Sequence, residues 1–215
     1  IGIGFVGGGF ITRFHIQSLI GVRNCEVLGV MSRTKSSAEE SAALARTIGV
    51  GEAKAFETVS DIVADPNIDA LWICAPNFTR IEIMEEIVDS IEDGKGELIG
   101  VTCEKPLGRN VKEAKKVLEL TQRVGLLDGY LENQVFAPSV TRGKEIIWSR
   151  GAKATGRPYL ARAAEEHSGP HMPWFWEGEL QGGGVLNDMM CHSVEEARFL
   201  LTDPEKKRES LTPVS

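Results

Sequence analysis

The sequence predicts an α/β protein with a doubly wound parallel sheet in residues 1–131. Short apolar runs alternate with amphipathic stretches of helical period, and the connections between them are short. This alternation favours parallel strands joined by right-handed crossovers. A glycine-rich turn at residues 7–12 directly follows the first apolar run and opens the first amphipathic stretch.

Six strands are expected where apolar residues run together. Their ranges are residues 1–6, 27–31, 53–56, 70–75, 98–103 and 126–131. The run at residues 70–75 is apolar throughout, which suits a parallel strand covered on both faces. A helical stretch separates each run from the next, so the strands are expected to lie parallel.

The first two helices are expected at residues 10–20 and 36–48. Ser36 and Glu39 have the spacing of a capping box, and Gly49 is placed to end the second helix. Three more helices are expected at residues 59–64, after the Pro76-Asn77 turn, and between Asn110 and Gly125. Asn110, followed by Glu113, is a typical N-cap for the last of them.

The composition changes after residue 131. Residues 132–184 contain four of the nine prolines and three of the four tryptophans. Loops are expected at residues 151–156 and 165–184, and one helix is expected at residues 185–201. The sequence therefore predicts two domains, with a boundary between residues 131 and 132.

Net charge and hydropathy narrow the classes of partner. The formal net charge of −7 and the isoelectric point near 5.3 argue against nucleic acid or an anionic membrane as a partner. No apolar run approaches the length that spans a bilayer. The four cysteines are far apart and form no C-x-x-C pair, which indicates reduced thiols and a cytoplasmic location.

Both ends of the chain look truncated. Residue 1 is an isoleucine inside the first expected strand, and residues 211–215 resemble the approach to another strand. A targeting signal before residue 1 is compatible with such a start.

The glycine turn has the composition of a site for a dinucleotide pyrophosphate. Gly7 allows the tight turn, and Gly9, which has no Cβ, lets the backbone approach phosphate closely. The amides of the first helical turn, at Phe10 and Ile11, have no intrahelical partner and point at the anion. Thr12 replaces the last small residue of the pattern, and we expect it to loosen the packing slightly. A glycine-rich loop without a ligand is the alternative interpretation.

The end of the second expected strand indicates which nucleotide is bound. An acidic residue here selects NAD by accepting hydrogen bonds from the ribose 2′-hydroxyl. This chain instead has Ser32, Arg33 and Lys35, which suit a 2′-phosphate. We therefore expect NADP, with NAD as the alternative if Arg33 stacks on adenine or lies in solvent.

Two further segments carry chemically reactive side chains. Lys105, within Glu104-Lys105-Pro106, follows a strand at the sheet edge that faces the ligand in doubly wound folds. Asp188 and His192 are four residues apart, so in one helix their side chains share a face.

These motifs together resemble the Gfo/Idh/MocA family of nicotinamide-dependent sugar and polyol oxidoreductases. The matching pieces are, in family order, the glycine turn, Pro76-Asn77, Glu104-Lys105-Pro106, and the Asp188 and His192 pair after a glycine cluster. The resemblance implies a Rossmann dinucleotide-binding domain at residues 1–131. It also implies that residues 132–215 begin an α+β substrate-binding and oligomerisation domain whose antiparallel sheet is largely missing. A homo-oligomer is expected at full length.

The resemblance also implies roles for residues. His192 would take or return the substrate hydroxyl proton. Asp188 would orient the substrate or stabilise the imidazolium, and Lys105 would hold and polarise the reacting oxygen. The remaining cofactor contacts are expected from Ala75, Pro76, Asn77 and Glu104, together with Lys105. No metal is required by this chemistry.

A second cluster lies in the expected loop at residues 165–184. His171 and Trp174 would line a sugar site, although core or interface packing explains the aromatic residues equally well. A metal site from His167, His171 and Cys191 is not expected, because Gly169-Pro170 interrupts any helix that would align the two histidines.

Two other functions remain open for a chain of this pattern. Some members of the family use bound NAD to cleave glycosidic bonds through transient oxidation, and others bind the nucleotide as regulators. The retention of both Lys105 and His192 argues against a regulator. Arg80 occupies a position where many relatives have histidine, so the resemblance implies no role for it.

Overall fold

The structure is a computed structural model that describes residues 1–205. Six strands form one sheet in the order β3-β2-β1-β4-β5-β6, and every pairing is parallel. The strands are β1 (Gly2–Val6), β2 (Glu26–Met31), β3 (Lys54–Phe56), β4 (Ala70–Ile73), β5 (Gly100–Glu104) and β6 (Leu127–Leu131). The doubly wound parallel sheet expected from the sequence is confirmed, and this strand order is that of dinucleotide-binding folds.

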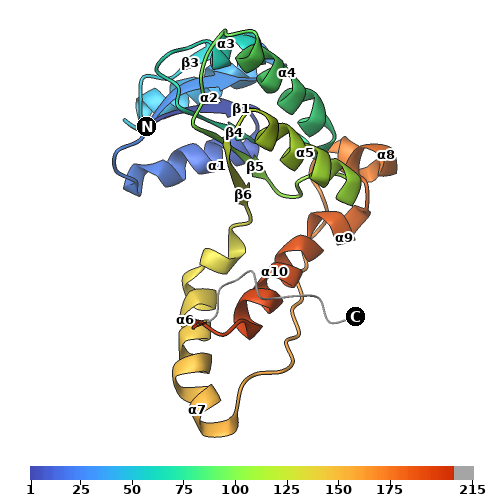
Figure 1. The fold of residues 1–215 in the computed structure, drawn as a ribbon. Helices are drawn as coiled ribbons and strands as arrows, with labels where there is room; N and C mark the ends of the chain where they lie inside the picture. Colours follow the sequence, from blue (N-terminus) through green and yellow to red (C-terminus); the bar gives the residue numbers. More distant parts are fainter. Residues whose placement is uncertain (206–215) are drawn as a thin grey trace. The chain divides into compact units, whose positions relative to one another are not determined.

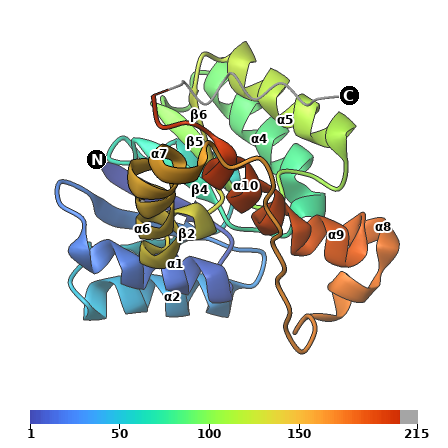
Figure 2. The same ribbon diagram turned by 90° about the horizontal axis from the view of Figure 1, so that it is seen from below.

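Helices cover both faces of the sheet (Figures 1 and 2). They are α1 (Phe10–Ser18), α2 (Lys35–Thr47), α3 (Val59–Val63), α4 (Arg80–Glu92) and α5 (Val111–Arg123), with single 3-10 turns η1 (Leu19–Gly21) and η2 (Asn77–Thr79). α1 and α2 lie on one face, and α4 and α5 lie on the other (Figure 2).

Each face of the sheet has its own hydrophobic cluster. The α1 and α2 side buries Phe5, Ile16 and a row of alanines of α2. The opposite side buries residues of α3, α4 and α5 against the central strands, including Leu71 and Ile87. All five residues of β1 are buried, so the strand that leads into the glycine turn is fixed from both sides.

The N-terminal ends of three helices differ in how their side chains cap them. Asn110 caps α5 by accepting a hydrogen bond from the Glu113 amide at 3.0 Å, as its position predicts. The expected capping box at Ser36 and Glu39 is wrong, because α2 begins one residue earlier, after Thr34, with no side-chain cap. A capping box does form at Thr58 and Asp61 before α3.

The chain divides into two compact units. Unit 1 comprises Ile1–Leu131 together with Glu179–Gly182, and unit 2 comprises Glu132–Gly178 and the chain from Gly183 onward. The expected second domain took in all of residues 132–215, whereas the short segment at 179–182 packs with the first unit. The expected approach to a strand at residues 211–215 lies outside the described residues.

Unit 2 is helical in the part of the chain that the structure describes, and that part contains no strand. Its elements are η3 (Gln134–Phe136), α6 (Pro138–Ile146), the π-helical turn η4 (Ile147–Gly151), α7 (Ala152–Thr155), η5 (Pro173–Trp176), α9 (Gly184–Asp188) and α10 (Met190–Leu201), with α8 (Gly178–Gln181) at the boundary between the units. The loop expected at residues 151–156 is wrong, because α7 continues the helical path until Gly156, which has a φ of +92°.

The single helix expected at residues 185–201 is also wrong. Met189, with φ −103° and ψ −41°, separates α9 from α10. Asp188 therefore ends one helix, and His192 lies in the first turn of the next. The shared helix face that was expected for these two residues depended on a continuous helix, which is not formed.

No helix among the described residues is both long and apolar enough to cross a bilayer.

Candidate active site

The carboxyl ends of four neighbouring strands bring most of the expected cofactor residues to one edge of unit 1. Gly7 follows β1, Ser32 follows β2, Ala75 follows β4, and Lys105 follows β5. Because the strands are parallel, these ends share one edge of the sheet. The connections that leave β1 and β4 lead to helices on opposite faces of the sheet. Doubly wound folds bind ligands in the crevice between two such strands.

The glycine turn is held tightly against the strand ends. Gly7 has a φ of +113°, and a Cβ there would lie 2.7 Å from the Ala75 amide nitrogen. The Gly7 amide donates to the Met31 carbonyl at 2.8 Å. A Cβ on Gly8 would lie 2.7 Å from the Ser37 carbonyl oxygen. These two glycines are therefore needed by the fold itself.

Gly9 differs from its neighbours because the space beside it is open. A Cβ there would meet no described atom within 4 Å, and its backbone is extended rather than left-handed. Gly9 is the N-cap of α1 and has no side-chain cap, so the first amides of the helix, including those of Phe10 and Ile11, are free to bind an anion. An open cradle at a helix N-terminus fits a dinucleotide pyrophosphate.

Thr12 does not loosen the turn as expected. Its side chain is completely buried, and its hydroxyl donates to the Gly7 carbonyl at 2.6 Å. The hydroxyl therefore fastens α1 to the turn where a glycine would only allow close packing.

The residues after β2 are exposed and basic. Arg33 lies on the surface, and Lys35 Nζ is 3.6 Å from Glu57 Oε1 in an exposed ion pair. The Ser32 hydroxyl accepts a long hydrogen bond of 3.4 Å from the Thr34 amide.

Glu104 ends β5, and its carboxylate is bound inside the protein. Its Oε1 lies 2.7 Å from His15 Nε2, and its Oε2 accepts the Lys105 amide at 2.9 Å. Both side chains of the His15 and Glu104 pair are about nine-tenths buried. The His15 ring packs edge-on against Trp72, with ring centroids 5.2 Å apart. Glu104 was expected to contact the cofactor, but both of its oxygens already have partners in the chain.

Arg80 supports the same segment from the other side. Its side chain is 1% exposed, and its guanidinium donates to the carbonyls of Ala75, Glu104 and Pro106. Burial lowers the pKa of the Arg80 guanidinium, which nevertheless remains charged. Arg80 thus joins the loops after β4 and β5, and the family resemblance gave no indication of this role.

Asn77 and Arg109 attach the segment at residues 179–182 to unit 1. The Asn77 side-chain amide donates to the Gln181 carbonyl at 3.0 Å, and Arg109 donates to the Glu179 carbonyl at 2.8 Å. Gly182 has a φ of +96°, and a Cβ there would lie 2.5 Å from the Arg109 carbonyl oxygen. Asn77 is 3% exposed, and its side-chain oxygen is buried without a hydrogen-bond partner among the described residues.

In unit 2, His192 pairs with a residue that sequence reasoning missed. Its Nδ1 makes a short hydrogen bond with Glu132 Oε1, and the two side chains are 7% and 4% exposed. Asp188, the expected partner, is half-buried, and the residue that bonds His192 Nδ1 is Glu132 instead. Glu132 lies 60 residues away in sequence, so no local spacing signals the pair.

The histidines and aromatic residues expected to form a sugar site at residues 165–184 are more exposed than the buried histidine–glutamate pairs described above. His171 is exposed, and Trp174 is half-buried and stacks on Phe175 with ring centroids 3.8 Å apart. His167 Nδ1 accepts the Gly169 amide at 3.0 Å. Within residues 1–205, no group of three or more His, Cys, Asp or Glu side chains is arranged to hold a metal ion.

The two buried cysteines are unreactive. None forms a disulfide in the described chain, and Cys74 and Cys103 are buried. Burial raises the pKa of the Cys103 thiol to about 11 and raises that of Cys74 further. Both therefore stay protonated at neutral pH and are poor nucleophiles.

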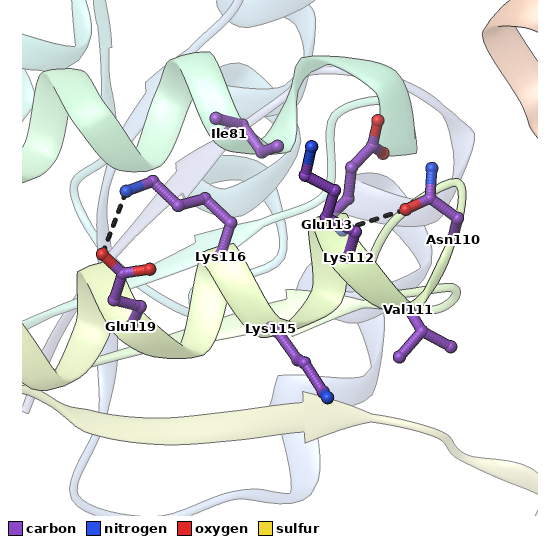
Figure 3. Close-up of a pocket in the computed structure, with 8 residues that line it drawn as sticks. All are labelled: Ile81, Asn110, Val111, Lys112, Glu113, Lys115, Lys116 and Glu119. Atoms are coloured by element: carbon purple, nitrogen blue, oxygen red, sulfur yellow. Dashed lines mark hydrogen bonds and ion pairs between the residues drawn. The ribbon is translucent and has the colours of Figure 1, made fainter.

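A surface hollow elsewhere on unit 1 contains none of the expected cofactor residues (Figure 3). It is lined by residues of α5, by Ile81 of α4 and by the Asn110 cap. Lys116 lies 3.1 Å from Glu119 along one side of it. No residue of the glycine turn lines the hollow.

The sheet order and the open glycine turn define a dinucleotide-binding α/β protein. Residues 1–128 match the model of the family described as "Oxidoreductase family, NAD-binding Rossmann fold", and residues 150–211 match the "GFO/IDH/MocA C-terminal domain". The chain therefore belongs to the Gfo/Idh/MocA family, which confirms the resemblance inferred from its motifs.

Two of the curated relatives of the chain are named as a reductase or a dehydrogenase of a sugar derivative. It is 29% identical over 202 residues to 1,5-anhydro-D-fructose reductase of Ensifer adhaerens, covering 93% of this chain and 56% of the relative. It is 26% identical over 213 residues to levoglucosan dehydrogenase of Pseudarthrobacter phenanthrenivorans, covering 94% of this chain and 51% of the relative. The chain thus spans about half the length of the curated relatives that it matches.

A solved structure with a similar fold contains a nucleotide. GenD2 from gentamicin A biosynthesis, in complex with NAD, aligns with a TM-score of 0.78 and 26% identity. The alignment covers 95% of this chain and 54% of GenD2.

Proposed function

We propose that the protein transfers hydride between a nicotinamide dinucleotide and a CH–OH carbon of a sugar, polyol or related hydroxy compound. The observation that carries the proposal is the glycine turn at the switch point of the sheet, with an open face at Gly9 and free amides at the start of α1. Lys105 follows the strand end two positions along the same edge.

In this proposal each part of unit 1 binds a different part of the nucleotide. Gly9, Phe10 and Ile11 bind the pyrophosphate at the start of α1, where the backbone amides have no intrahelical partner. Gly7, whose own amide is bound to the Met31 carbonyl, shapes the turn that lets the phosphates approach. The residues Ala75, Pro76 and Asn77 after β4, with Lys105 after β5, line the nicotinamide end. When bound, the nicotinamide ring supplies the two-electron acceptor or donor for the substrate carbon.

The protein's own groups handle the proton and the developing charge. Lys105 hydrogen-bonds the reacting oxygen and stabilises the alkoxide character that develops on it. His192 accepts the hydroxyl proton in oxidation and returns it in reduction. Asp188 orients the substrate hydroxyls. Glu104 and Arg80 act on the backbone around Lys105 rather than on the ligand.

The substrate class comes from the relatives' names, which include an anhydrofructose reductase, inositol dehydrogenases and a levoglucosan dehydrogenase. His171 and Trp174 are proposed as part of the sugar site, where an aromatic face would contact the C–H surface of the ring.

The test is a panel of sugars and polyols assayed with NADP and NAD at the reduced-nicotinamide absorbance band. Lys105→Ala and His192→Ala should each lower kcat by roughly 100-fold or more, since each removes a group that acts on the transferring proton or on the oxygen. Glu145→Gln, an exposed carboxylate of α6, is the matched control and should leave kcat unchanged. Turnover that survives both active-site substitutions rejects the assignment.

NADP is the proposed cofactor, supported by the absence of an acid after β2 and by the exposed Arg33. Arg33→Ala should weaken NADPH binding about 10-fold and leave NADH binding nearly unchanged, because the lost guanidinium would pair with the 2′-phosphate. Arg23→Ala, at the opposite edge of the sheet, is the control. Equal or tighter binding of NADH by the unsubstituted protein contradicts NADP preference.

We also propose that the full-length protein is a cytoplasmic homo-oligomer. The acidic charge supports the location, and the match of residues 150–211 to the family's C-terminal domain supports the oligomer, because the resemblance implies assembly through that domain. Light scattering of the full-length protein tests it, and a monomer at micromolar concentration contradicts it.

A further inference from the structure

Glu132 and His192 both belong to unit 2, and a short hydrogen bond joins their side chains. Both side chains are more than nine-tenths buried. Two ionisable groups are removed from water together only where they satisfy each other, because an unpartnered buried charge is costly.

The Glu132 carboxylate is also held by hydrogen bonds from groups other than His192. It comes directly after β6, and its carboxylate accepts the amides of the next helical turn, that of Gln134 at 3.1 Å and that of Val135 at 3.5 Å. The Gln134 side chain in turn donates to Glu165 at 2.7 Å. The carboxylate therefore has a fixed orientation that is set by the backbone of η3.

The orientation of the bond determines which ring nitrogen carries the proton. An ionised carboxylate only accepts hydrogen bonds, so its partner Nδ1 must be the N–H of the imidazole. In the neutral ring Nε2 then has the free lone pair. Among the described residues none makes a hydrogen bond to His192 Nε2, so that lone pair is not used within the fold.

We propose that Glu132 is a positioning residue that fixes His192 in the Nδ1–H tautomer and thereby makes Nε2 the atom that exchanges the substrate proton. This inference rests on the proposed function for the identity of the base. Glu132 does not touch the reacting atoms. It acts by holding the ring and excluding the other tautomer, as a buried carboxylate does in other base–orienter pairs.

Ring nitrogen-15 spectroscopy tests the tautomer without any assay of turnover. The chain contains only four histidines, so His192→Gln identifies the His192 signals by their disappearance. At a pH where the ring is neutral, the unsubstituted protein should show a protonated Nδ1 and an unprotonated Nε2. Glu132→Ala should move the His192 signals towards the Nε2–H form, whereas Glu145→Gln should not change them.

Kinetics of the same variants test the consequence. Glu132→Ala should lower kcat about 100-fold with KM changed less than about 3-fold, because the wrong tautomer disables general base catalysis without altering substrate contacts. Glu132→Gln should recover most of the loss, since its amide oxygen still accepts from Nδ1–H.

The outcomes separate this proposal from the proposed function. An Nε2–H ring in the unsubstituted protein overturns the positioning role whatever the kinetics show, and this measurement needs no variant to fold. An Nδ1–H ring together with unchanged kcat in Glu132→Ala also overturns it. An Nδ1–H ring in a protein whose His192→Ala variant keeps full turnover contradicts the proposed base instead.

Discussion

The two units of the molecule bury different kinds of side chain. Unit 1 encloses two hydrophobic clusters, one on each face of a six-stranded sheet. Both clusters lie within residues 1–131, and the described part of unit 2 buries few apolar side chains, of which Val135 and Met189 are the main ones. Its most deeply buried pair is the polar one formed by Glu132 and His192.

Yet each unit contains one buried histidine–glutamate pair. In unit 1, His15 binds Glu104 at the end of β5, and in unit 2, His192 binds Glu132 just after β6. The first pair is surrounded by aromatic rings and a hydrophobic core. The second depends on a short helical turn for its orientation. We infer that apolar packing stabilises unit 1, whereas hydrogen bonds to a few polar groups define unit 2.

The largest expected effect compares equivalent truncations in the two units. Leu71→Ala, in the centre of β4 and fully buried, should lower the free energy of unfolding by about 3–5 kcal/mol. Leu200→Ala, at a half-buried position in α10, should cost less than about 1 kcal/mol, because little area returns to water. Hydrogen exchange of the β4 and α10 amides measures the stability of each unit separately. Equal losses would contradict the comparison.

Substitution of the buried Arg80 in unit 1 should lower the free energy of unfolding almost as much. Arg80→Lys should cost about 2–3 kcal/mol, because one ammonium group cannot reach the three carbonyls that the guanidinium joins. The control is Arg123→Lys, whose exposed pair with Glu92 should contribute less than about 1 kcal/mol. Urea denaturation of both variants measures the difference. Arg80→Lys with the stability of the control would mean that the loops after β4 and β5 hold without the guanidinium.

A substitution in the glycine turn should weaken nucleotide binding without changing the stability of the fold. Gly9→Ala should leave the melting temperature unchanged, because the added methyl group meets no described atom within 4 Å. The same methyl group lies where phosphate would approach, so the Kd for NADPH and NADH should rise at least about 10-fold, or about 1.4 kcal/mol. Gly21→Ala is the control, since its surroundings are equally open and it lies outside the turn. Nucleotide binding by Gly9→Ala that matches the unsubstituted protein would contradict the cradle.

The smallest expected effect is a dependence on pH that belongs to unit 1. Lys54 lies 2.6 Å from Asp65, and this partner together with the Asn67 hydrogen bonds holds the pKa of the Asp65 carboxyl below its ordinary value of 3.8. A lowered pKa contributes stability above the unfolded-state value, and the contribution is lost as the pH falls through the folded-state value.

Asp65→Asn should therefore cost about 0.5–1 kcal/mol at pH 7, since Lys54 is mostly exposed and the pair is screened. The difference from the unsubstituted protein should shrink as the pH falls below 3.8 and vanish once the pH is below the lowered folded-state pKa of Asp65. Urea denaturation at both pH values measures it, and a difference that persists in acid would assign the effect to packing instead of charge.

Unit 1 was predictable because its signals are local. Apolar runs mark the strands, and glycines such as Gly49, with a φ of +73°, end helices where the sequence indicates. The motif order also located Lys105 at the correct edge of the sheet. The capping-box spacing at Ser36 was misleading, because Thr34 is the N-cap of α2 and caps it without a side-chain hydrogen bond.

The supporting residues were not predictable from the sequence. His15 and Glu104 are 89 residues apart, and Glu132 and His192 are 60 apart, so only the folded chain brings each pair together. The break at Met189 has no glycine or proline to announce it. The residues proposed to carry the reaction occur in recognisable motifs, whereas the groups that hold the surrounding chain are brought together by tertiary contacts alone.

The close approach of Gly182 to Arg109 means that the nucleotide-binding unit is not built from one continuous piece of polypeptide. The chain leaves this unit at Leu131 and returns some fifty positions later to lend it four residues. A protein shortened at Leu131 would deprive the Asn77 amide and the Arg109 guanidinium of the carbonyls that they bind. An isolated sheet unit would keep both hydrogen bonds only if these four residues were supplied with it.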